Sequence, residues 1–154
     1  MSATLPLARA AFINQMNRDT IPTERPRLLA VLDAMIAWSA ARPERVRFRA
    51  DTNERGIVRF EALGAKAVIW AATPRRNDTP VLDLLPGASR FLSAQERAGA
   101  IETLSAHTRE TLDPIGRLHI GFGALKNANA CTAVLALMDE LLEKTENGTR
   151  QDVA

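Results

Sequence analysis

Four arginines occupy alternate positions of two neighbouring segments, where they could bind an anion together. Residues 45–50 read Arg-Val-Arg-Phe-Arg-Ala, and residues 57–62 read Ile-Val-Arg-Phe-Glu-Ala. Alternate side chains of a β-strand point to opposite faces of a sheet, so the arginines and Glu61 would share one face and the valines and phenylalanines the other. The forked donors of arginine match the oxygens of carboxylates and phosphates. The sequence therefore predicts a half-buried antiparallel sheet whose basic face carries Arg45, Arg47, Arg49 and Arg59.

Trp70 and two further arginines could enlarge this basic face. Trp70 alternates with Lys66 and Val68 in residues 66–71, so we expect its ring beside the arginines, as a surface for stacking or cation–π contacts. Arg75 and Arg76 lie in the loop that follows. The simplest alternative is a solvated face with cross-strand ion pairs, which would have no binding role. The face could also bind a protein partner, a second copy of the chain, or a nucleic acid.

A second candidate site lies in residues 117–127, which read as a strand, a glycine-rich turn and a helix. Glycines allow a close approach of the backbone to a ligand, and a helix N-terminus attracts anions. The spacing matches neither a P-loop nor a dinucleotide-binding fingerprint. Tight packing of the strand against the helix is the alternative. The residues that would form this ligand site are His119, Gly121, Gly123 and Lys126.

Other reactive groups give weaker signals. Cys131 falls in the first turn of the last helix, where His119 or His107 could assist a thiolate, but its place on an apolar stripe favours a buried structural cysteine. With two histidines and one cysteine, a metal site would depend on carboxylates, and their spacing does not indicate one. Asp83 is expected to pair with an arginine across the sheet. We therefore expect no metal and no cofactor.

Composition is that of a globular protein. The chain has 154 residues, of which 46% are hydrophobic and 25% charged, with a net charge of +2. That charge is too small to make the whole molecule a polyanion binder, so a basic patch must be local. One cysteine excludes an internal disulfide. The sequence contains no signal-peptide pattern and no apolar run of about 20 residues, so we expect a cytoplasmic protein without membrane contact.

Hydrophobic periodicity predicts one α+β domain over residues 1–154, with a two-layer architecture. It is an antiparallel four- to five-stranded meander packed against helices, in the order α-α-β-β-β-β-α-β-α. Ser93 and Glu96 form a capping box that should begin the third helix. The docking of the first helix, on the core or on a neighbour, is left open, and residues 145–154 are expected to fray. The expected helices are 2–16, 23–41, 93–112 and 130–144, and the expected strands are 45–50, 57–62, 66–71, 81–85 and 118–122.

This order resembles that of small α+β domains of unknown function that occur in bacteria, alone or beside nuclease-like modules. The resemblance covers roughly residues 24–144 and includes the strand at Arg117 to Ile120 and the helix from Val134 to Leu142. It implies a fold and transfers no functional residue. Because no catalytic constellation is present, the residues favour a non-enzymatic binding or protein-interaction module, with self-association as one form of it. The alternative is a small enzyme or anionic-ligand-binding protein at the His119 region, and a weak nucleic-acid binder is third.

Overall fold

The structure is a computed structural model that describes residues 4–50, 56–109, 112 and 116–153, with residues 149–153 described through their backbone alone. The α-helices are α1 (Leu5–Asp19), α2 (Arg25–Ala40), α3 (Ala94–Ser105), α4 (Phe122–Leu125) and α5 (Ala128–Val153). The short 3₁₀ helices η1 (Pro22–Glu24) and η2 (Ala88–Arg90) precede α2 and α3. The strands are β1 (Val46–Phe48), β2 (Val58–Ala62), β3 (Ala67–Thr73), β4 (Val81–Leu84) and β5 (Leu118–Gly121).

The strands form one antiparallel sheet in which each strand pairs with the next along the chain, in the order β1-β2-β3-β4-β5. β5 joins the sheet at its β4 edge, with His119 opposite Asp83. The predicted α+β architecture, the meander and the order of its main elements are confirmed.

A β-bulge in β3 reverses the faces of part of that strand. Phe60 pairs with Trp70, but the next residue, Glu61, pairs with Val68, so Ile69 is the extra residue. A bulge inserts one residue into a strand and shifts the alternation of its side chains. Trp70 therefore shares the face of Phe60, whereas Val68 shares the face of Glu61.

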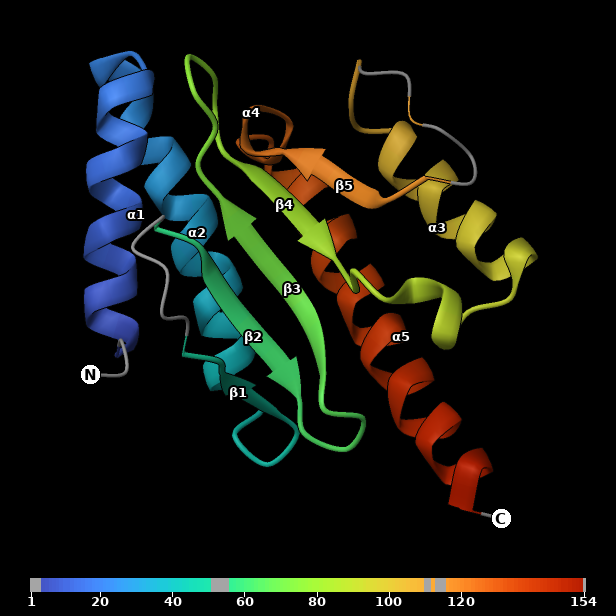
Figure 1. The fold of residues 1–154 in the computed structure, drawn as a ribbon. Coiled ribbons are helices and arrows are strands. Elements are labelled where there is room, and N and C mark those ends of the chain that lie inside the picture. Colours follow the sequence, from blue (N-terminus) through green and yellow to red (C-terminus); the bar gives the residue numbers. More distant parts are fainter. Residues whose placement is uncertain (1–3, 51–55, 110–111, 113–115, 154) are drawn as a thin grey trace.

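Helices α1, α2 and α5 cover the face of the sheet that carries Phe60 and Trp70 (Figure 1). The rings of Phe60 and Trp70 stack with their centroids 5.0 Å apart. The indole N–H of Trp70 donates a 2.7 Å hydrogen bond to the hydroxyl of Ser39 in α2, and both residues are buried. The buried apolar residues of the sheet and of these helices form one core cluster.

Helix α3 lies beside the β5 edge, and within the described residues no helix covers the other face of β2, β3 and β4 (Figure 1). The N-terminus of α3 is fixed by the predicted capping box. The amide of Glu96 donates to the Ser93 hydroxyl, and the amide of Ser93 donates to the Glu96 carboxylate. We call the uncovered side the open face of the sheet.

Three helix boundaries differ from those expected. α1 extends to Asp19, and α3 ends at Ser105 rather than near residue 112. α5 continues to Val153, where we expected a frayed tail from residue 145. Tertiary contacts explain this continuation, because Thr145 is fully buried and Glu146 forms an ion pair with Arg45 at 2.6 Å.

Within the described residues, none of the helices has both the length and the apolar content that a bilayer-crossing segment needs.

Candidate functional site: an arginine-lined hollow on the open sheet face

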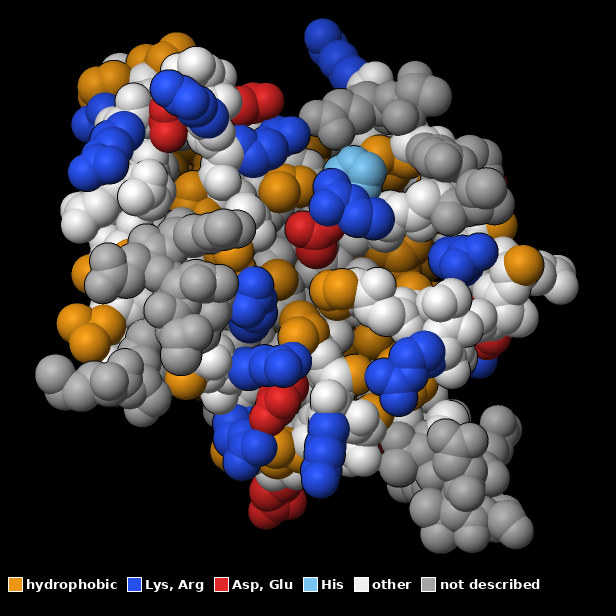
Figure 2. Space-filling view, in the orientation of Figure 1, with side chains coloured by type: hydrophobic (Ala, Val, Ile, Leu, Met, Phe, Trp, Pro, Cys, Tyr) orange, Lys and Arg blue, Asp and Glu red, His pale blue; other side chains and the backbone are white. Residues whose placement is uncertain are grey.

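The open face is hollowed over its middle strands. β3 presents small side chains there, Val68, Ala71 and Thr73, between longer residues of the neighbouring strands. Leu85 and Pro86, which follow β4, form part of one wall. The resulting hollow has a volume of about 600 Å³, and Figure 2 shows apolar and uncharged atoms at the middle of this face, with Lys or Arg and a few acidic side chains around them. We call this the open-face hollow.

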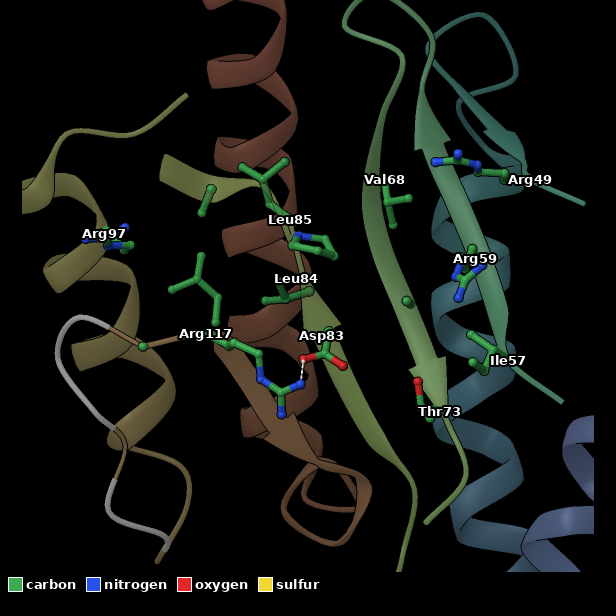
Figure 3. A pocket seen from close by; sticks show the side chains of 15 residues that line it. Arg49, Ile57, Arg59, Val68, Thr73, Asp83, Leu84, Leu85, Arg97 and Arg117 are labelled. Carbon is green, nitrogen blue, oxygen red and sulfur yellow. Dashed lines mark ion pairs between the residues drawn. The ribbon is translucent and has the colours of Figure 1, made fainter. Parts of the chain in front are cut away.

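Four arginines from different parts of the chain line the open-face hollow. Arg49 follows β1 and Arg59 lies in β2, whereas Arg97 comes from α3 and Arg117 directly precedes β5. Figure 3 shows Arg49 and Arg59 on one side of the hollow and Arg97 on the other, with Arg117 and Asp83 between them. Asp83 is the one acidic residue among the described residues that line it. Among the described residues that line the hollow, four arginines therefore stand against one carboxylate.

Two of these arginines have no partner in the described part of the chain. The side chains of Arg49 and Arg97 make no hydrogen bond or ion pair with any described residue, and the buried Nε of Arg97 lacks an acceptor. A buried donor without an acceptor costs about 1–3 kcal/mol. These groups are therefore ready to receive an anion.

The central ion pair of the hollow is loose. A distance of 3.6 Å separates Arg117 Nη1 from Asp83 Oδ1, which is longer than a hydrogen bond, and Oδ1 accepts no hydrogen bond from the described residues. The Arg117 side chain is 71% exposed and that of Asp83 is 16% exposed. The expected pairing of Asp83 with an arginine is confirmed, and its geometry leaves the guanidinium able to turn toward a ligand.

The arginines of the predicted basic face do not all lie on one surface in the structure. Arg47 lies on the open face and pairs with Glu61 across β1 and β2 at 2.8 Å. Arg45 does not lie beside Arg47 on this face. Its side chain turns to α5, where its guanidinium donates a bidentate hydrogen bond to the Glu146 carboxylate. That hydrogen bond raises the pKa of the Arg45 guanidinium above its ordinary value. The prediction that Arg45 shares a surface with Arg49 and Arg59 is wrong, because an acidic partner 101 residues away holds it elsewhere.

The sequence prediction also assigns Trp70 to the wrong face of the sheet. It is fully buried on the helix-covered face, stacked on Phe60, and takes no part in the open face. The cause is the bulge at Ile69, because in a regular strand Trp70 and Val68 would point to the same face of the sheet.

Arg75 and Arg76 do not extend the basic face either. They lie in the loop between β3 and β4, where they line a separate hollow with Arg18 and Asp19 of α1. Arg75 donates to the carbonyl of Thr79 at 2.8 Å, and its guanidinium lies 3.4 Å from Asp78. This loop is stabilised by its own polar contacts, separate from the open-face hollow.

The predicted ligand site at the glycine turn does not converge on one point. His119 lies on the open face opposite Asp83, and its Nδ1 is 3.2 Å from the carbonyl of Arg117. Lys126 instead forms an ion pair with Glu24 of η1.

One of the two glycines precedes a helix of only four residues, and the other lies within that helix. Gly121 is its N-cap, and a Cβ at Gly123 would meet the Thr79 hydroxyl at 3.8 Å, an ordinary contact. At Gly123, therefore, the backbone forms no close approach that requires glycine.

Neither a reactive thiol nor a metal centre emerges from the described residues. Cys131 is half-buried against the core, and burial raises the pKa of its thiol, which disfavours the thiolate. No group of three or more histidine, cysteine, aspartate or glutamate side chains among the described residues is placed to hold a metal ion.

Sequence reasoning missed Arg97 and Arg117 as site residues. Arg97 lies in the first turn of a helix, where no periodic pattern distinguishes it, and only the packing of α3 beside β5 brings it to the sheet. One signal could have identified Arg117. Asp83 in β4 is expected to pair with an arginine across the sheet, and Arg117 directly precedes β5, the strand beside β4.

No protein-family model, curated protein or solved structure matches this chain.

Proposed function

We propose that this protein is a non-enzymatic binding module that holds an anionic group of its partner in the open-face hollow. The observation that supports this most is the convergence of Arg49, Arg59, Arg97 and Arg117 on one concave surface. Arginine forms bidentate, charge-assisted hydrogen bonds with carboxylates and phosphates, and these are about twice as strong as neutral ones.

The size and shape of the hollow agree with a binding role. Its volume of about 600 Å³ falls in the range of ligand sites, roughly 300–1,000 Å³. An anion that reaches Arg97 would supply the acceptor that its buried Nε lacks. Binding would therefore offset a cost that the free protein carries.

Self-association through this face has less support. A two-fold dimer places the same patch on both sides of the interface. Among the described residues, the open face brings five arginines against two carboxylates, Glu61 and Asp83, so two copies would repel each other there. The partner we propose is therefore a different, acidic molecule.

The other candidate functions are weaker on this geometry. An enzyme centred on His119 would need Lys126 close by, and Lys126 pairs with Glu24 instead. A nucleic-acid binder would gain from a base-stacking surface, and Trp70 is buried on the other side of the sheet.

Isothermal titration calorimetry with tripolyphosphate, a compact polyanion, tests the proposed function. The wild-type protein should bind it at low salt, and the double substitution Arg97→Gln/Arg117→Gln should weaken binding at least about tenfold, because each lost charge-assisted bond contributes about 1.5–3 kcal/mol. The matched control is Arg18→Gln/Arg76→Gln, which removes the same charge from two exposed arginines outside the hollow. Equal weakening by both pairs would indicate attraction by net charge alone and would contradict the assignment.

A further inference from the structure

We infer that the occupant of the open-face hollow is an extended peptide segment with acidic residues at both ends and apolar residues between them. This inference rests on the proposed function and specifies the partner of the same site.

Guanidinium groups lie at both ends of the hollow. Arg49 and Arg59 lie at the β1–β2 side and Arg97 lies toward α3, whereas Arg117 reaches toward Asp83 between them (Figure 3). Guanidiniums at two separate ends fit two separate anionic groups better than one central charge.

The middle of the hollow disfavours a further anion. Its floor is apolar at Val68 and Ala71, and Leu85 adds an apolar wall. Asp83 lies beside this floor, opposite Ala71 in the sheet register. A carboxylate or phosphate placed here would meet both an apolar surface and a like charge, and like charges held together in an interface weaken binding.

The distance between the two ends fits a short stretch of extended chain. From β2 to β5 there are three strand-to-strand steps, or about 14 Å at the usual spacing. An extended chain covers about 3.3 Å per residue, so about four or five residues span the hollow. A segment with acidic residues around a two-residue apolar centre would place its carboxylates at the two ends of the hollow.

A nucleic acid fits these features less well. Among the described residues that line the hollow, none is aromatic, so bases would find no stacking platform. A nucleic-acid strand also carries a phosphate at every nucleotide, which would place a charge near Asp83.

Calorimetry with two capped six-residue peptides tests the inference. One peptide has the order Glu-Glu-Val-Val-Glu-Glu, and the other is hexaglutamate, which carries more charge. We expect the wild-type protein to bind the split-charge peptide about tenfold more tightly, because hexaglutamate places carboxylates against Asp83. The substitution Asp83→Asn should reduce this preference to about twofold or less. Asp78→Asn is the matched control, since Asp78 pairs with Arg75 in the β3–β4 loop outside the hollow.

The remaining outcomes separate this inference from the proposed function. Equal or tighter binding of hexaglutamate, still dependent on Arg97 and Arg117, would overturn the split-charge segment and leave the binding module intact. Tighter binding of a six-nucleotide oligothymidylate than of either peptide would assign the hollow to a nucleic acid. Binding of neither peptide, together with no binding of tripolyphosphate, would overturn the proposed function itself.

Discussion

The two faces of one sheet differ in how completely their polar groups are satisfied. On the covered face, the Trp70 N–H has a 2.7 Å hydrogen bond to Ser39, and Ser39 in turn donates to the carbonyl of Met35. On the open face, the guanidinium of Arg97 is without a partner among the described residues, and the Arg117–Asp83 pair is loose. Both faces are built from the same strands, whose side chains alternate between them except at the bulge in β3. The difference suggests that the covered face provides the stability of the fold and the open face is available for binding.

The largest loss of stability should come from removing a large buried side chain on the covered face. Trp70→Ala removes a fully buried ring and should lower the free energy of unfolding by about 3–5 kcal/mol. Val68→Ala, on the open face of the same strand, is the control and should cost about 1.5 kcal/mol or less, because Val68 is only half-buried. Urea unfolding followed by circular dichroism measures both. Similar losses for the two variants would contradict the division between the faces.

A smaller loss of stability should come from weakening the contacts of Glu96 at the N-terminus of α3, the helix that carries Arg97. The hydrogen bond from Lys144 and the amide of Ser93 lower the pKa of Glu96 from 4.5 to about 2. Because this pKa is depressed in the folded state, the contribution of Glu96 to stability is present above about pH 4.5 and is lost as the pH falls toward 2.

Urea unfolding at a series of pH values checks this contribution. The difference in unfolding free energy between the wild type and Glu96→Gln should be constant near neutral pH and should shrink below pH 4.5. Glu102→Gln, an exposed position on the same helix, should show no such trend. A pH-independent difference for Glu96→Gln would show that the ion pair and cap do not stabilise α3 through the charge of Glu96.

The sequence alone predicts most of the fold, because the elements have clear periods and end signals. The alternation in residues 45–50 and 57–62 locates β1 and β2, and the Ser93–Glu96 capping box gives the start of α3. The C-terminal end of α5 was predicted too early, because the ion pair between Glu146 and Arg45 joins residues far apart in sequence.

The candidate site was predicted only in part, at Arg49 and Arg59. Trp70 was assigned to the wrong face because the run Ala67–Thr73 is nearly all apolar, so no polar residue in it reveals the bulge at Ile69. Arg97 reaches the hollow through the packing of α3 beside the sheet, which depends on contacts that a local pattern does not encode. Local rules therefore predict the strands and, where no bulge intervenes, their faces, whereas the membership of a site is decided by tertiary contacts.

The most direct test of the central claim is a nuclear magnetic resonance titration that follows the Nε–H signals of the arginine side chains. The capped Glu-Glu-Val-Val-Glu-Glu peptide is added to the wild-type protein at low salt. Our account predicts that the signals of Arg97, Arg117 and Arg49 shift together with one dissociation constant, while that of Arg45, held by Glu146, stays in place. Shifts confined to Arg75 and Arg76, or spread evenly over all arginines, would contradict the assignment of the open-face hollow as the binding site.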